Sequence, residues 1–94
     1  MIDSSQKEII IKKLAPYEPK KLGVFGSYAR GENTMHSDLD LLVEFGLRIN
    51  LFDLISLEQD LSESLGVKVD LVTERALSPY IRPYVERDYK SILP

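Results

Sequence analysis

Two carboxylates, Asp38 and Asp40, are the residues of this chain whose type and spacing best suit chemistry. They lie in the run 37–43, which begins with Ser37 and whose other residues besides the two acids are apolar. Side chains of a β-strand alternate between its two faces, so we expect both acids on one face and most apolar residues on the other. Two such acids repel each other unless a cation lies between them, and Mg²⁺ prefers carboxylate oxygens. The pattern therefore predicts a metal-binding strand.

A turn of small residues precedes this run by ten positions and predicts a phosphate site. We expect a short apolar strand near 22–26, after which Gly26 lets the backbone approach a ligand. Ser27 is expected to cap a short helix that starts at Tyr28 and ends at Gly31. Backbone N–H groups at a helix start attract phosphate. A Gly-Ser pair alone is usually an ordinary turn, so the combination with the acidic strand is what indicates a nucleotide site.

The two runs 26–32 and 37–43 together resemble the signature of the DNA polymerase beta superfamily of nucleotidyltransferases. In particular they resemble the minimal nucleotidyltransferase (MNT) antitoxins of HEPN/MNT toxin–antitoxin modules. The resemblance is dense over 22–45 and thinner, but consistent in element order, over 46–94. It implies that residues 1–94 form one minimal α/β domain, a mixed sheet with helices on one face. It also implies transfer of AMP from ATP to a tyrosine of a cognate HEPN ribonuclease toxin, within a hetero-oligomer that silences the toxin.

A third carboxylate on a neighbouring strand is part of what this resemblance implies. Residues 67–72 alternate as a strand does, with Asp70 on the face opposite the apolar side chains, and this acid is the candidate. Asp38, Asp40 and Asp70 would then hold two Mg²⁺ ions, with Mn²⁺ as a substitute. Asp70 would complete the site of the ion bound to the attacking hydroxyl and is also a candidate to accept its proton. Taken alone, Asp70 is more typical of a solvent-facing strand acid.

The phosphate-side residues implied by the resemblance are Gly26, Ser27 and Arg30. The amides that follow Gly26, together with Ser27, would bind the β- and γ-phosphates of ATP. Arg30 lies one helical turn further and offers a planar donor fork to the triphosphate. It has an equally good surface role as the ion-pair partner of Glu32 or Glu44.

Three further residues near these motifs have a structural and a functional interpretation. Glu44 shares the face of the two strand acids, but strand geometry places it about 13 Å beyond Asp40, too far to share a metal site. Tyr28 either packs on the core or stacks on a base. His36 is the only histidine and lies in a polar loop, where a solvated side chain is more common than a ligand or base.

Two helices are expected to support the strands. The first covers 5–14, with capping-box spacing from Ser5 to Glu8 and a stop before Pro16. The second covers 51–65, because apolar residues recur there at helical spacing. An Asn50–Asp53 cap pattern opens this second helix and Gly66 is expected to end it.

The tail, 78–93, allows more than one interpretation. Ser78 followed by Pro79 is typical of a helix start, yet Pro83 requires either a kink or a new helix start at that point. The segment contains three tyrosines and two arginines, residue types that protein interfaces enrich. It therefore either docks a partner or packs on its own domain.

Composition limits the other possibilities. The chain has 94 residues, 44% of them hydrophobic, and no cysteine, which excludes disulfides, thiol catalysis and a Cys-type zinc site. Fifteen acidic against twelve basic residues give a net charge of −3, so we expect no direct nucleic-acid partner. No apolar run reaches the length of about 20 residues that a membrane span needs, and signal-peptide regions are not seen at the start, so we expect no membrane partner and a cytoplasmic location.

Two other functions agree with the sequence. A binding-only antitoxin would mask its toxin, but such a protein has no physical need for three mutually repelling acids. A transferase that modifies a small molecule would need an acceptor pocket, which a chain of 94 residues can scarcely build alone. A gene for a small helical partner beside this one would favour either antitoxin over the small-molecule enzyme.

Overall fold

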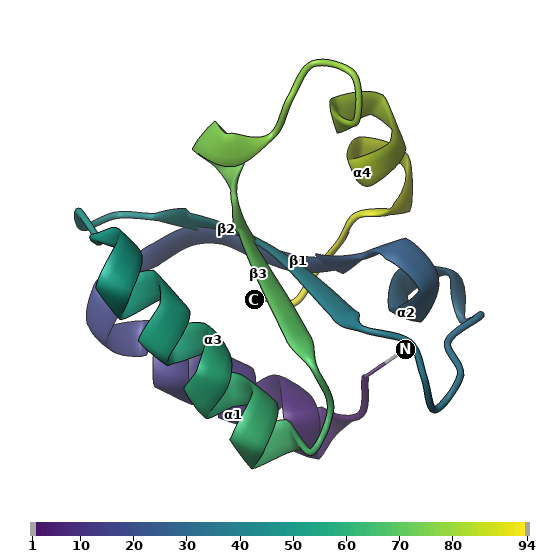
Figure 1. The fold of residues 1–94 in the computed structure, drawn as a ribbon, viewed down its shortest axis with the longest axis horizontal. Helices are drawn as coiled ribbons and strands as arrows, with labels where there is room; N and C mark the ends of the chain where they lie inside the picture. Colours follow the sequence, from purple (N-terminus) through teal and green to yellow (C-terminus); the bar gives the residue numbers. More distant parts are fainter. Residues whose placement is uncertain (1, 94) are drawn as a thin grey trace.

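A computed structural model describes residues 2–93 and contains one four-stranded sheet with helices on both faces (Figure 1). Its elements in chain order are α1 (Ser4–Leu14), the 3-10 turn η1 (Ala15–Tyr17), β1 (Pro19–Phe25), α2 (Gly26–Arg30), β2 (Leu39–Phe45), α3 (Leu51–Leu65), β3 (Val69–Thr73), the 3-10 turn η2 (Glu74–Ala76), α4 (Arg82–Asp88) and β4 (Lys90–Ser91). The strands near 22–26, 38–45 and 67–72 and the two long helices predicted from the sequence are all present. Within the described residues, no helix has the length and apolar character needed to cross a membrane.

The sheet is mixed, with strand order β3-β2-β1-β4. β2 runs parallel to β3, and the long helix α3 connects them, as parallel neighbours require a crossover. β1 pairs with β2 and with β4 in the antiparallel sense. The expected mixed α/β architecture is confirmed.

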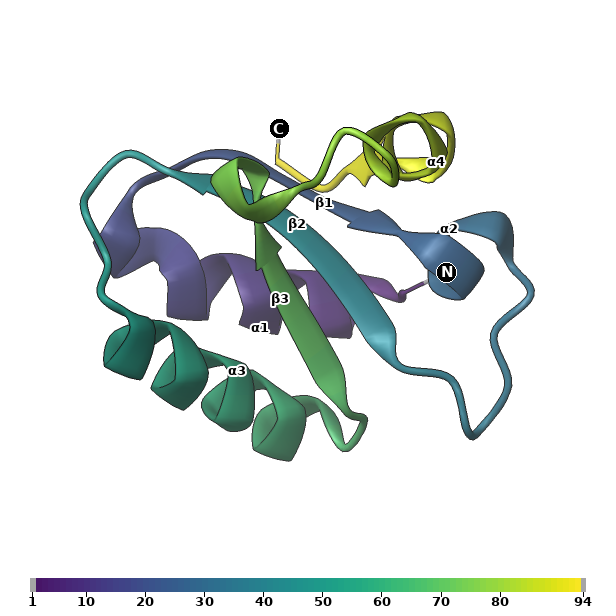
Figure 2. The ribbon, with the colours of Figure 1, turned by 45° about the horizontal axis from the view of Figure 1, so that its top comes forward.

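α1 and α3 lie side by side on one face of the sheet (Figure 2). An ion pair joins them, with Lys13 Nζ 3.0 Å from an Asp60 carboxylate oxygen. Beneath them, the apolar residues of β1, β2 and β3 form the main core with both helices. The fully or almost fully buried members include Ile10, Leu14, Leu22, Val24, Leu39, Leu41, Val43, Leu61 and Val69. The apolar face predicted for the acidic strand is therefore the face that builds this core.

The opposite face also carries a helix (Figure 2), whereas the sequence predicted helices on one face only. Leu42 of β2 is buried there against Leu77 and Val85, in a second small core that Tyr89 also joins. α4 lies on this side of the sheet (Figure 2). The tail covers this face because its apolar residues have no other surface on which to bury their side chains.

The two long helices differ in how well their caps were predicted. α1 starts two residues after Ile2, with Asp3 as its N-cap rather than Ser5, and its capping box joins Asp3 to Gln6 rather than Ser5 to Glu8. The Asp3 carboxylate accepts the Gln6 N–H at 2.8 Å, and the Gln6 amide oxygen accepts the Asp3 N–H at 2.9 Å. Both boxes fit the sequence rule, and the earlier one gives a longer helix.

At α3 the predicted cap is confirmed. Asn50 Oδ1 accepts the Asp53 N–H at 2.8 Å. Gly66 follows the last helical residue at φ 69°, as expected for a residue that ends a helix in the left-handed region.

The tail forms α4 and then the short edge strand β4, which the sequence did not predict. α4 has Pro83 in its first turn, so the proline marks a new helix start rather than a kink. β4 pairs with Gly23 and Val24 of β1. A Cβ on Gly23 would overlap the ring of Tyr89 and lie 2.6 Å from the Lys90 carbonyl oxygen. The absence of a side chain at this position lets the tail close against the sheet.

Candidate active site

Asp40 and Asp70 lie directly beside each other at the beginnings of the parallel strands β2 and β3. Their Cα atoms are register partners, so their side chains project from the same face of the sheet. Asp38 immediately precedes β2 and has the same parity as Asp40. The structure therefore brings together the three acids that the sequence singled out, on the face that carries α4.

The acids interact strongly. Burial raises the pKa of Asp40, the charges of Asp70 and Asp38 and hydrogen bonding to Asp70 add to this, and the result is a pKa of about 6. The positive charge of Arg30 lowers the pKa of Asp40, against these other effects. A half-buried acid with a raised pKa beside two more acids is the environment that a bound cation would relieve.

No three His, Cys, Asp or Glu side chains in residues 2–93 already surround a single ion position. One acid has another partner, since Lys68 Nζ lies 3.7 Å from an Asp38 carboxylate oxygen. The Lys68 side chain is 72% exposed, so it is held weakly and can move away. The donor set itself, three carboxylates with one raised pKa, fits a hard divalent ion such as Mg²⁺.

The turn at Gly26 lies against this acid cluster. Gly26 has φ +72°, and a Cβ at this position would overlap the Oδ2 atom of Asp40. The predicted close approach of the backbone is thus present, and Asp40 is what it approaches. Gly31, also at φ +72°, ends α2 as predicted.

Ser27 does not cap α2 in the way the sequence predicted. α2 begins at Gly26, its N-cap is Phe25, and no side chain caps its first turn. The left-handed φ of Gly26 turns the chain from β1 into the helix two residues earlier than expected, which places Ser27 within the first turn. The Ser27 hydroxyl is therefore not engaged in capping.

A substitution at Gly26 should report on this close approach. We expect Gly26→Ala to destabilise the protein by about 1–3 kcal/mol, because alanine is strained at this φ and its methyl group collides with Asp40. Gly31→Ala is a matched control, since Gly31 has the same φ but nothing within 4 Å of a Cβ. Urea denaturation of both variants measures the difference. Equal losses at the two glycines would contradict the contact with Asp40.

Arg30 is held at the edge of the site by two carboxylates. Its Nε atom donates to Glu32 at 3.0 Å and its Nη1 atom donates to Asp88 of α4 at 2.6 Å. The hydrogen bond with Glu32, and next the one with Asp88, raise the pKa of Arg30. Glu32 is the partner that the sequence predicted for Arg30, Asp88 was not predicted, and the alternative partner Glu44 is wrong.

The remaining residues near the motifs have structural roles. Tyr28 is partly buried and packs against the main core. His36 is exposed in the loop between α2 and β2, and its backbone N–H donates to the Thr34 hydroxyl at 3.2 Å. Glu44 is exposed near the far end of β2, where its register partner is Lys21. None of these three side chains joins the acid cluster.

Comparison with known proteins assigns the family. The nucleotidyltransferase domain family matches residues 5–92. The protein adenylyltransferase MntA of Thermococcus cleftensis is 44% identical over 69 residues, which cover 73% of this chain and 70% of that protein. A solved toxin–antitoxin structure with AMP-PNP is 28% identical, with a TM-score of 0.83, over 93% of this chain and 72% of that one.

A chain from a second solved complex has the same fold at lower identity. This complex contains an MNT antitoxin and a tri-AMPylated HEPN toxin from Shewanella oneidensis. The likeness has a TM-score of 0.78 at 24% identity and covers 98% of this chain and 72% of that one. The family match covers nearly the whole chain, residues 5–92. The fold of this chain also brings the three acids together near the Gly26 turn. The chain belongs to the nucleotidyltransferase domain family.

Proposed function

We propose that this protein transfers AMP from ATP to a tyrosine of a HEPN-family toxin and thereby silences the toxin. The observation that carries the proposal is the register of β2 and β3, which sets Asp40 beside Asp70 and next to the Gly26 turn. The similarity to a protein adenylyltransferase and to a toxin–antitoxin chain solved with an ATP analogue supports the same function.

Asp38, Asp40 and Asp70 would hold two Mg²⁺ ions, for which Mn²⁺ could substitute. When bound, these ions supply positive charge at the entering and leaving oxygens of an in-line displacement at phosphorus. A bond forms between the tyrosine oxygen and the α-phosphorus, and the bond from the α-phosphorus to the pyrophosphate oxygen breaks. Asp70 would accept the tyrosine proton as the bond forms.

The phosphate side of the site would use the turn after β1. The amides that follow Gly26 and the uncommitted hydroxyl of Ser27 would bind the β- and γ-phosphates, which leave as pyrophosphate. Arg30 is already oriented by Glu32 and Asp88, so its guanidinium loses little further freedom in meeting a triphosphate. Tyr28 packs on the core, which fixes the short helix that carries these residues.

The direct test is label transfer. The purified protein is incubated with Mg²⁺ and the HEPN-family product of the neighbouring gene, with ATP labelled at the α-phosphate in one sample and at the γ-phosphate in another. We expect the toxin to acquire the α-label only, on tyrosine, and its ribonuclease activity to fall. No label on the toxin, with full loss of ribonuclease activity on mixing, would support the binding-only antitoxin instead.

The tail offers a surface for the partner. Its residues Val85 and Ile92 are buried in the domain, whereas Tyr80, Ile81 and Tyr84 are exposed. The tail thus both packs on its own domain and presents apolar side chains outward. The Arg87 guanidinium lies 5.6 Å from the centre of the Tyr84 ring, so these two residues form one unit.

We expect Tyr84→Ala with Arg87→Ala to weaken the toxin complex while ATP binding remains unchanged. Aromatic and arginine anchors that act as hot spots contribute roughly 2 kcal/mol or more each. Isothermal titration calorimetry with the toxin and with ATP measures both effects. Lys7→Ala, on the helix layer of the other sheet face, is the control. Unchanged toxin affinity in the double variant would remove the tail from the interface.

A further inference from the structure

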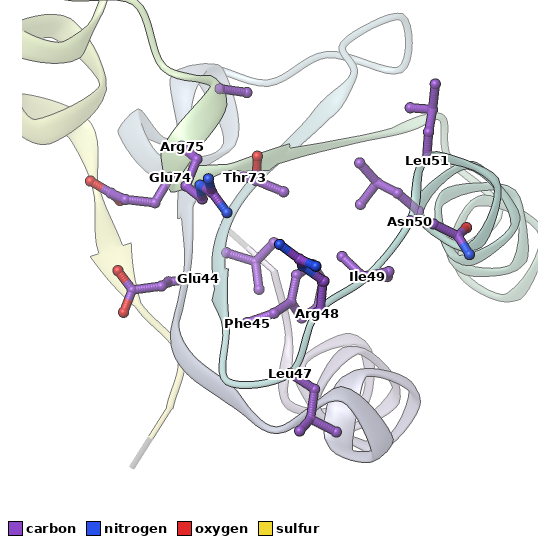
Figure 3. Close-up of a pocket in the computed structure, with 13 residues that line it drawn as sticks. Glu44, Phe45, Leu47, Arg48, Ile49, Asn50, Leu51, Thr73, Glu74 and Arg75 are labelled. Carbon is purple, nitrogen blue, oxygen red and sulfur yellow. The ribbon is translucent and has the colours of Figure 1, made fainter.

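One pocket of the described residues lies away from the three acids and is partly enclosed by its lining. It has a volume of about 410 Å³ and lies between the ends of β2 and β3, the start of α3 and the turn η2 (Figure 3). Strand geometry puts Glu44, at its rim, about 13 Å along β2 from Asp40. We call it the distal pocket, and it is lined by Val43, Glu44, Phe45, Leu47, Arg48, Ile49, Asn50, Leu51, Leu54, Thr73, Glu74, Arg75 and Ala76.

Apolar side chains line most of the distal pocket and continue outside it. Leu51 of the pocket rim is 66% exposed, and its neighbour Phe52 is 82% exposed. Ile55, four residues after Leu51, is exposed on the same side of α3. A pocket that opens onto a continuous exposed apolar surface is typical of a site for another macromolecule rather than for a small ligand alone.

Two arginines give this surface its charge. Within residues 2–93, the side chains of Arg48 and Arg75 take part in no hydrogen bond or ion pair. Both side chains extend into the middle of the lining residues in Figure 3, whereas the carboxylates of Glu44 and Glu74 point outward. The pocket mouth therefore presents two unpaired positive charges over an apolar floor.

The nearby carboxylate of Glu74 does not neutralise these arginines. It is paired with Arg82 at 2.5 Å and with Lys21 at 3.3 Å. The Arg82 hydrogen bond lowers the pKa of Glu74 despite its burial, so Glu74 stays ionised and committed to these partners. Glu44 is a second acid of the lining and has no ion pair within residues 2–93, so the two arginines and Glu44 together leave the distal pocket with one excess positive charge on a chain whose net charge is −3.

We propose that the distal pocket and the adjoining surface of Leu51, Phe52 and Ile55 dock an acidic, apolar segment of the partner toxin. Apolar side chains of that segment fill the pocket, and its carboxylates pair with Arg48 and Arg75. The inference rests on the proposed function, because it names where the partner binds. Docking at the far end of β2 leaves the three acids open for ATP and the acceptor tyrosine.

A second copy of this chain is a poorer occupant. A two-fold dimer places the same patch of both copies face to face, so the excess positive charge of one patch would face that of the other. Like charges in contact oppose such a dimer. An acidic partner segment meets no such repulsion.

The test is charge reversal, Arg48→Glu with Arg75→Glu, in the full-length protein. The control is Lys7→Glu with Lys12→Glu, which changes two exposed lysines of α1. Each exchange lowers the net charge by 2, so both double variants have a net charge of −7 instead of −3. Binding to the HEPN-family product of the neighbouring gene is measured by calorimetry at low and high salt. Circular dichroism and melting temperature establish that both variants fold.

We expect at least a tenfold loss of toxin affinity in the arginine variant and less than a threefold loss in the lysine variant. The salt dependence of binding should also become shallower only when the arginines are reversed, because fewer charge pairs then form. Phe52→Ser should weaken binding without changing the salt dependence. ATP binding should be unchanged in every variant.

Three results would overturn the inference. If the parent binds and modifies the toxin and the arginine variant binds equally well, the docking site is wrong and the proposed function stands. If the parent neither binds nor modifies the toxin, the proposed function fails and the inference fails with it. If the parent alone sediments as a dimer that the arginine variant disrupts, a second copy occupies the surface.

Discussion

Asp70→Asn should abolish AMP transfer while leaving the toxin complex intact. We expect the rate to fall roughly a thousandfold or more, which corresponds to about 4 kcal/mol of lost transition-state stabilisation. The physical reason is that Asp70 lies in register with Asp40 and, in the proposed function, completes the metal site and accepts the tyrosine proton. Label transfer from ATP to toxin measures the rate, and calorimetry measures the affinity for toxin.

The control for this prediction is Glu44→Gln, which removes an exposed carboxylate from the far end of the same strand. It should transfer AMP at the parental rate. A variant with Asp38, Asp40 and Asp70 all changed to asparagine should bind toxin but fail to silence its ribonuclease activity. If this triple variant rescues toxin-expressing cells as completely as the parent does, the enzyme assignment is wrong and the binding-only antitoxin is favoured.

Removal of the divalent cation should abolish AMP transfer and strongly weaken ATP binding. The three acids repel one another and repel the triphosphate, and the ions are the only proposed source of compensating charge between them. Calorimetry should detect tight ATP binding with Mg²⁺ or Mn²⁺ and weak binding after chelation. Without nucleotide the metal itself should bind weakly, because the triphosphate provides ligand oxygens that the acids lack.

The raised pKa of Asp40 gives this metal dependence a pH dependence. Asp40 has a pKa of about 6, so protons should compete with Mg²⁺ and lower its affinity as the pH falls through 6. Metal binding in the presence of ATP that is constant from pH 7.5 to pH 5 would contradict the proposed site. ATP binding that does not depend on metal would contradict it as well. Asp38→Asn with Asp40→Asn should lose the dependence along with the binding.

The same pKa predicts a stabilising effect of Asp40→Asn on the metal-free protein. Asp40 has a higher pKa folded than unfolded, so its contribution to stability is fully present below the unfolded value near 4 and is lost as the pH rises through 6. At pH 7.5 the asparagine variant should therefore melt at a higher temperature than the parent. The difference should disappear below about pH 3, where Asp40 is protonated in both states.

The sequence by itself determined the features that follow from local patterns. Alternation along 37–43 correctly placed Asp40 and the buried Leu39, Leu41 and Val43 on opposite faces of β2. Helical spacing and the Asn50 cap correctly predicted α3. Gly26 and Gly31 were correctly identified as turn residues, because only their backbone conformation was at issue. These properties depend on neighbours within a few positions, so periodicity and residue type are sufficient to predict them.

Only the tertiary structure decided how distant segments meet. It set β3 parallel to β2 in the register that pairs Asp70 with Asp40, added β4 at the other edge, and connected Arg30 to Asp88 across 58 positions. It also placed the tail over the face that was expected to be open. Each of these outcomes depends on hydrogen bonds and apolar burial between residues far apart in the chain. A local pattern cannot show which surface a segment will bury, because that depends on which other surfaces remain uncovered after the main core has formed.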